Sequence, residues 1–305
     1  MPAKWFICPD GQWTKINECY EKCRMHQRCM TIETLMEIGR ERKWTGVPSV
    51  TQLLKGTRQA YLEIRKDYAI DPQDQAFSLL GTKHHLKLEK NLINTPTLLE
   101  VGMSEFGISG IADHYDAESQ ILTDYKTSGS YKVAKVVGIV KITREEPILR
   151  PDGTPLILKS GKNKGKPKTR KITSFEIRPE TRDGFDWDMQ LNMYRIFFER
   201  AGFKVKKMQI QATVRDGGTY IAKQRGIDKN IYLIPIPFIN DNDVIIYFKS
   251  KADDLLWALQ NEVMPYRCSD YESWKGRRCE NYCPVSAYCS HYEETGKEED
   301  LFFIQ

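Results

Sequence analysis

The chain has 305 residues, of which 40% are hydrophobic and 29% charged; this composition is typical of a folded globular protein and excludes wholesale disorder, a collagen-like repeat and a fibrous rod. Its formal net charge of +5 is mild, so it permits an anionic partner but does not demand one. No apolar run approaches the ~20 residues that span a bilayer, and the first residues lack the apolar segment of a signal peptide, so we expect a cytoplasmic protein with no membrane partner.

The first half of the chain predicts a cysteine-rich module followed by helices and then strands. Residues 1–30 hold the first four cysteines, and residues 31–76 are typical of a helical segment. Within it, Ser49 with Gln52 three residues later indicates a capping box, and Asp71-Pro72 favours the start of a further helix, which carries His85. Strand-like stretches follow at 97–103, 106–112 and 120–126.

The second half predicts more strands, two long helices and another cysteine-rich module. Residues 133–178 have the pattern of strands and loops, with a tight turn at 151–154. The remaining predicted elements are a helix at 186–200, strands at 207–215 and 230–237, and a helix at 243–262. Residues 263–305 hold the last four cysteines and an acidic tail. Strands framed by helices predict an α/β fold class with a mixed central β-sheet flanked by helices.

The eight cysteines form two quartets with identical spacing, C-x10-C-x3-C-x5-C. The first is Cys8, Cys19, Cys23 and Cys29, and the second is Cys268, Cys279, Cys283 and Cys289. Disulfides are disfavoured in a reducing cytosol, and buried free thiols would not gather among polar and charged residues. Four thiolates hold either Zn2+ or a [4Fe-4S] cluster. The spacing predicts metal binding and leaves open which cofactor is bound and whether the quartets share ligands.

A basic run from Lys159 to Lys171 holds seven positive charges and no negative one. One interpretation is a solvated, flexible loop; the other is a loop that contacts phosphates. Under the second, the candidate nucleic-acid-binding residues are Lys162, Lys164, Lys166, Lys168 and Arg170.

Two strands around residue 117 carry the candidate chemistry. A tight turn at 116–119 would make them a hairpin in which Asp113 faces Leu122. Side chains alternate along strands, so Asp113, Asp124 and Lys126 would lie on one face. Two carboxylates and an amine are costly to bury unless something binds them, and a divalent cation such as Mg2+ or Mn2+ is the natural partner. The alternative is a surface hairpin with a solvated Asp–Lys pair.

Four motifs in order make the chain resemble the RecB-type branch of the PD-(D/E)XK nucleases. They are a helical Gly-x-x-x-His pattern ending at His85, a strand with Gly110-x-x-Asp113, a strand with Asp124-Tyr125-Lys126, and a helix with Gln190-x-x-x-Tyr194. The resemblance covers residues 77–215. It implies a restriction-endonuclease-like core at 77–262, interrupted by a basic insertion at about 145–178.

The resemblance also implies roles for individual residues. His85, Asp113 and Asp124 would ligate Mg2+ or Mn2+ together with the Tyr125 carbonyl, and Lys126 would be the catalytic lysine. Gln190 and Tyr194 would help hold the site and the DNA strand. Iron–sulfur members of this branch join one early cysteine to a late C-x2-C-x5-C triplet. The late spacing here is x3 and x5, so two zinc sites remain an alternative.

The expected function is therefore a Mg2+- or Mn2+-dependent deoxyribonuclease, of exonuclease type, in recombination, replication, repair or defence of a bacterium or phage. No Walker loop occurs in the chain, so an unwinding motor would be a separate helicase, and a recombinase or replication protein is another expected partner. The alternative functions are a non-catalytic nucleic-acid-binding scaffold with two zinc modules and a transcription-type zinc protein.

Overall fold

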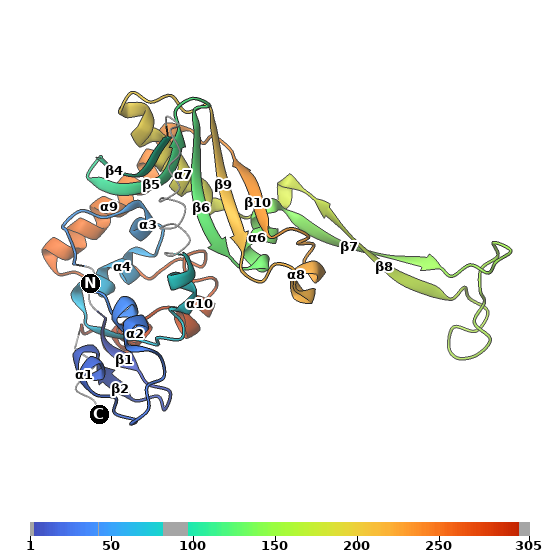
Figure 1. The fold of residues 1–305 in the computed structure, drawn as a ribbon, viewed down its shortest axis with the longest axis horizontal. Helices are drawn as coiled ribbons and strands as arrows, with labels where there is room; N and C mark the ends of the chain where they lie inside the picture. The colour runs from blue at the N-terminus through green and yellow to red at the C-terminus, as the bar shows by residue number, and fades with distance from the viewer. Residues whose placement is uncertain (1–2, 42, 82–96, 299–305) are drawn as a thin grey trace. The chain divides into compact units, whose positions relative to one another are not determined.

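The computed structural model describes residues 3–41, 43–81 and 97–298. Its elements, traced in Figure 1, separate into two compact units. Unit 1 comprises residues 1–124, 186–209 and 236–305, and unit 2 comprises residues 125–185 and 210–235. The α/β class predicted from the sequence is confirmed, because mixed sheets and helices make up the fold.

Unit 1 begins with a small sheet. Strand β1 (Ala3–Ile7) pairs antiparallel with β2 (Trp13–Lys15) and parallel with β3 (Tyr68–Ile70). Helices α1 (Ile16–Glu21) and α2 (Ile32–Ile38) follow β2. A cluster of buried residues, Phe6, Ile16, Cys19 and Leu35, forms the core of this part.

The helices of unit 1 test several sequence-based expectations. The capping box is confirmed, because the Ser49 hydroxyl accepts a hydrogen bond from the Gln52 amide at 3.3 Å where α3 (Val50–Leu53) begins. Helix α4 (Thr57–Arg65), which the sequence did not predict separately, follows immediately. Asp71 caps a turn rather than a helix, and helical structure starts only at 76. The other helices of this unit after residue 236 are α9 (Asp241–Asn261), α10 (Arg277–Asn281) and α11 (Ser286–Thr295).

A five-stranded sheet has the order β10-β9-β6-β5-β4. Its strands are β4 (Thr97–Glu105), β5 (Ile108–Asp116), β6 (Ile121–Ser128), β9 (Lys207–Val214) and β10 (Ile231–Ile236), which confirms all five predicted strand regions. Helix α7 (Phe185–Arg200) coincides with the helix predicted at 186–200. Phe106 and Gly107 join β4 to β5, and their φ angles of 56° and 73° are those of a two-residue hairpin turn.

The register of the β5–β6 hairpin differs from our prediction. Tyr115 pairs with Leu122 and Asp116 with Ile121, so the turn occupies 117–120 rather than 116–119. Asp116 accounts for the shift, because its carboxylate accepts the amides of Glu118 and Ser119 and so closes a turn that starts later. The pairing ends at His114 and Thr123, and Asp113 and Asp124 are the adjoining residues on the two strands.

Unit 2 contains a helix that the sequence did not predict, α6 (Ser130–Val137). Asp216 holds its first residue, accepting both the Ser130 amide and the Ser130 hydroxyl at 2.6 Å, and Arg225 donates to the same hydroxyl at 2.8 Å. Short elements η1 (Pro179–Thr181) and α8 (Tyr220–Gln224) complete the unit's helices in the described residues.

Strands β7 (Ile139–Pro147) and β8 (Thr169–Ile177) of unit 2 pair only with each other in the described structure and form an antiparallel ribbon. Most side chains of both strands are exposed. The connecting residues 148–168 continue the ribbon through bridges between Leu149 and Pro155 and between Ile157 and Pro167. The predicted tight turn at 151–154 is confirmed, with Gly153 at φ 82°.

Candidate functional site

Two aspartates are buried on neighbouring strands of unit 1. Asp113 of β5 is 8% exposed, and Asp124 of β6 is 2% exposed. Burying one carboxylate is already costly, and burying two of like charge close together is more so. Carboxylates held in this way are typical of sites that perform chemistry or bind a cation.

Helix α7 reaches these aspartates through Tyr194, which lies against β5 at a glycine. A Cβ atom at Gly110 would stand 2.6 Å from the Tyr194 ring and 3.2 Å from the Phe197 ring. Only glycine therefore allows α7 to approach the strand this closely. This contact gives a physical reason for two of the motifs, because the glycine that precedes Asp113 by three residues seats the tyrosine of the Gln190–Tyr194 pair.

The electrostatics of Tyr194 place the two aspartates beside its hydroxyl. Burial raises the pKa of Tyr194, and the negative charges of Asp124 and, to a smaller extent, Asp113 raise it further. Hydrogen bonds from the Gln190 side chain and the Ile111 backbone act in the opposite direction. The Gln190 amide donates to the Tyr194 hydroxyl at 3.1 Å, and both side chains are buried. Gln190 and Tyr194 are therefore in direct contact, and the charges of both aspartates act on the Tyr194 hydroxyl.

Two further buried polar side chains anchor α7, and sequence reasoning missed both. The Asn192 amide donates to the Pro237 carbonyl at 2.9 Å and its oxygen accepts the Ile239 amide at 2.9 Å. Arg195 pairs with Glu199 at 2.7 Å and also with Asp241. Asn192 lies inside the Gln-x-x-x-Tyr segment and Arg195 directly after it. The spacing of these residues does not indicate that they anchor the helix.

Of the remaining predicted site residues, two lie on strand β6 and one lies outside the described structure. Tyr125 and Lys126 follow Asp124 on β6, and Lys126 lies two positions on, where strand side chains return to the same face. His85 belongs to residues 82–96, outside the described structure. Its predicted role as a metal ligand therefore remains a prediction.

The donor set is suited to a hard cation, although it is incomplete. Carboxylate oxygens are the ligands that Mg2+ and Mn2+ prefer. Among residues 3–41, 43–81 and 97–298, no three His, Cys, Asp or Glu side chains are arranged to hold a metal ion. Asp113 and Asp124 offer two carboxylates, and the predicted metal site with His85, which lies outside the described residues, remains a prediction.

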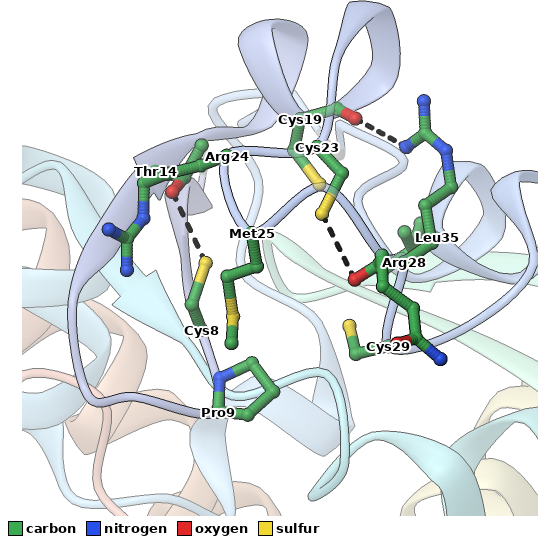
Figure 2. A pocket seen from close by; sticks show the side chains of 11 residues that line it. Cys8, Pro9, Thr14, Cys19, Cys23, Arg24, Met25, Arg28, Cys29 and Leu35 are labelled. Carbon is green, nitrogen blue, oxygen red and sulfur yellow. Dashed lines mark hydrogen bonds between the residues drawn. The ribbon is translucent and has the colours of Figure 1, made fainter.

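The cysteine quartets gather in two separate places within unit 1. Thiols of the first quartet line one small cavity, shown in Figure 2. In the second, burial raises the pKa of Cys268 and raises that of Cys283 to about 11, and both are influenced by Cys279. Each quartet therefore has its own neighbourhood, and the binding of a metal by either quartet remains a prediction.

A buried arginine supports the second quartet. Arg58 is 5% exposed, donates to the Cys289 sulfur at 3.5 Å and to the Pro265 carbonyl at 2.7 Å, and pairs with Glu293. Burial opposes its charge, but the bonds to Glu293 and Cys289 outweigh that effect and raise the pKa of Arg58.

The basic run lies at the end of the β7–β8 ribbon and is more ordered than a flexible loop. Backbone hydrogen bonds join Gly165 to the Leu158 carbonyl at 3.0 Å and Lys164 to the Gly161 carbonyl at 3.0 Å. Lys162, Lys164, Lys166 and Lys168 are all exposed. Arg170 is also exposed but pairs with Glu146 at 3.9 Å, so part of its charge is offset.

Comparison with known proteins gives little further information. No family model matches the chain, and no curated protein matches it. A solved structure named SSO0001 aligns with a TM-score of 0.39 at 19% sequence identity, covering 85% of this chain and 93% of that one. Among the helices in the described residues, none has the length and apolar character needed to cross a bilayer.

Proposed function

We propose that the protein is a metal-dependent nuclease that hydrolyses phosphodiester bonds in DNA. The observation that supports this most is the burial of Asp113 and Asp124 beside the hydroxyl of Tyr194. The order of the four motifs along the chain supports the same proposal, because it resembles that of the RecB-type PD-(D/E)XK nucleases. Their restriction-endonuclease-like core is accordingly part of the proposal.

In this proposal Asp113 and Asp124 hold a divalent cation such as Mg2+ or Mn2+. When bound, such an ion offsets charge on the scissile phosphate and lowers the pKa of a bound water. Lys126 would donate to a phosphate oxygen or orient the attacking water. Tyr194 and Gln190 would position the carboxylates. Water adds across one P–O bond, so one product ends in a phosphate and the other in a hydroxyl.

The basic end of the ribbon supports a nucleic acid as the substrate. Exposed lysines close together bind phosphates through charge without reading sequence. An antiparallel two-stranded ribbon also has the width that the major groove of duplex DNA admits. We therefore propose that Lys162, Lys164, Lys166 and Lys168 contact DNA backbone phosphates.

A digestion assay with linear, circular and single-stranded DNA tests the proposal in Mg2+, in Mn2+ and in a chelator. Wild-type protein should cleave only with the metal, and Asp113→Asn and Asp124→Asn should each abolish cleavage while DNA binding remains. Asp116→Asn is the matched control, because Asp116 lies on the same hairpin but its carboxylate only closes the exposed turn. Cleavage by Asp124→Asn at the wild-type rate would refute the assignment.

The second candidate function is a non-catalytic nucleic-acid-binding scaffold, and the exposed lysines of the ribbon favour it independently of the aspartates. Such a scaffold would bind DNA with the same salt dependence but cleave none under any metal. The assay above therefore separates the two functions.

A further inference from the structure

The first cysteine quartet brings together thiols from three places in the chain. Cys8 follows β1 at the turn into β2, Cys19 lies in α1, and Cys23 and Cys29 lie in the segment between α1 and α2. Figure 2 shows the four cysteines around one cavity, with the Cys19 and Cys23 sulfurs close together, Cys29 below them and Cys8 on the far side of the Met25 side chain. The quartet belongs to none of the elements that carry Asp113, Asp124 or Tyr194.

Cys19 is the most buried thiol of the quartet. It is 8% exposed and belongs to the buried core of this part of the chain. The other thiols have weak partners: the Cys8 sulfur lies 3.2 Å from the Thr14 hydroxyl, and the Cys23 thiol donates to the Gln27 carbonyl at 3.3 Å. Since no three cysteines of the described structure already stand as metal ligands, binding would require these thiols to turn into the cavity.

The core around the quartet is too small to hold this part of the chain by itself. Its buried residues are Phe6, Ile16, Leu35 and Cys19, so one of the four is a cysteine, and the hydrophobic residues packed against them are only partly buried: Ala3, Tyr20, Met30, Ile38 and Ile70. Small modules that bury this little apolar surface generally need a disulfide or a metal as a staple. All eight cysteines are free thiols here, so the cross-link that these residues can form is a bound metal ion.

The donor set and the surrounding charge favour a single ion. Four cysteines around one small cavity match structural zinc sites, which are almost always four-coordinate and tetrahedral. Four thiolates around a dication carry a net charge of −2. Arg28 borders the cavity and donates to the Cys19 and Tyr20 carbonyls at 2.5 and 2.9 Å, so its guanidinium offsets part of that charge, whereas Arg24, also at the cavity, pairs with Asp10.

We propose that Cys8, Cys19, Cys23 and Cys29 bind one Zn2+ in a closed, tetrahedral, structural site of their own. Binding forms four Zn–S bonds, breaks four S–H bonds and releases the four protons to solvent. No coordination position remains open, so this ion takes no part in hydrolysis. The site is independent of the second quartet and does not rest on the nuclease assignment.

Metal analysis of the full chain tests the proposal. The double variant Cys8→Ser/Cys29→Ser should contain one zinc per chain fewer than wild type. The matched variant Cys268→Ser/Cys289→Ser should keep that zinc, whatever the second quartet binds. Cys8→His should also keep it, because imidazole is a zinc ligand, whereas Cys8→Ala should lose it.

A second measurement covers the case in which a variant fails to fold. Co2+ added to metal-depleted Cys268→Ser/Cys289→Ser protein should give the visible absorption of tetrahedral cobalt thiolate, and one equivalent of Zn2+ should remove it. Equal zinc in wild type and Cys8→Ser/Cys29→Ser would overturn the proposal. So would iron that only the first-quartet variants lose, or the absence of a cobalt spectrum.

Discussion

The side-chain amide of Gln190 donates to the hydroxyl of Tyr194 at 3.1 Å, one turn further along α7. The negative charges of Asp124 and Asp113 act on the same hydroxyl and raise the pKa of Tyr194. The Gln190 amide therefore fixes the orientation of a neutral phenol that senses both carboxylates.

Tyr194→Phe removes that hydroxyl and keeps the ring that packs on Gly110. We expect cleavage to fall ~10–100-fold, the effect typical of residues that position metal ligands, and the Mg2+ concentration for half-maximal activity to rise. A rate measured across a Mg2+ titration checks this. Tyr232→Phe, which removes a hydroxyl bonded to Asp228 at 2.7 Å, serves as the control. An unchanged Mg2+ dependence in Tyr194→Phe would show that the tyrosine is only structural.

Gly110→Ala tests the contact between β5 and α7. The added methyl would stand 2.6 Å from the buried Tyr194 ring, so the ring or the strand must shift. We expect a loss of ~1–3 kcal/mol in the free energy of unfolding, the usual cost of overpacking. Gly102→Ala on the neighbouring β4 meets nothing within 4 Å and should change stability by less than ~0.5 kcal/mol. Urea unfolding of both variants measures the difference, and equal stabilities would contradict the packing argument.

Glu272 makes the stability of unit 1 depend on pH. Burial alone would raise its pKa, but the Lys251 amine at 2.6 Å and the Ser269 amide at 2.9 Å outweigh burial, so its pKa in the folded state lies below the usual 4.5. A lowered pKa contributes stability that is complete above the unfolded-state value and is lost as the pH falls through the folded-state value.

Glu272→Gln should therefore destabilise the protein at pH 7. The difference in the free energy of unfolding between this variant and wild type should narrow as the pH falls below about 4.5. Urea unfolding at pH 7 and in the acid range checks this. Glu262→Gln is a suitable control, because its pairing with Arg65 at 2.9 Å involves a carboxylate that is 67% exposed and exposed pairs contribute little. A difference in unfolding free energy that stays constant on acidification would show that the Glu272 carboxylate does not stabilise the fold.

Lys162, Lys164 and Lys166 should account for part of the salt dependence of DNA binding. Replacing all three with Gln should reduce the slope of log affinity against log salt by ~0.9 for each phosphate that the variant no longer neutralises. The measurement is equilibrium binding by catalytically inactive Asp124→Asn protein over a range of salt concentrations. Lys249→Gln, which removes a surface charge paired with Asp253, should leave the slope unchanged. An unaltered slope in the triple variant would show that the basic run is solvated and does not contact DNA.

The long, strongly patterned elements could be predicted from the sequence, whereas the details that depend on other parts of the chain could not. Helix α7 and strands β9 and β10 follow from periodicity, and the start of α3 follows from the capping chemistry of Ser49. Helix α6 was missed because its β-branched valines suggest a strand. Asp216, far along the chain, holds the start of this helix.

The candidate site could likewise be predicted only in part from the sequence. Asp113, Asp124, Gln190 and Tyr194 were predicted together from motif order; the structure joins Gln190 to Tyr194 by a hydrogen bond, and the shared site remains a prediction. The register of the hairpin was wrong by two residues, because side-chain hydrogen bonds of Asp116 select the turn and alternation alone does not. The anchoring role of Asn192 depends on the carbonyl of Pro237, 45 residues further on, which no local pattern indicates.

The exposure of the β7–β8 ribbon has a practical consequence for testing the proposed contact with DNA. Trypsin cleaves after lysine and arginine, and exposed segments that protrude from packed elements are preferred sites of nicking. The run from Lys159 to Lys171 holds seven basic residues on an exposed segment. Bound nucleic acid would shield these bonds from the protease, so the rate of nicking reports occupancy of the ribbon directly, without any need for cleavage of the DNA.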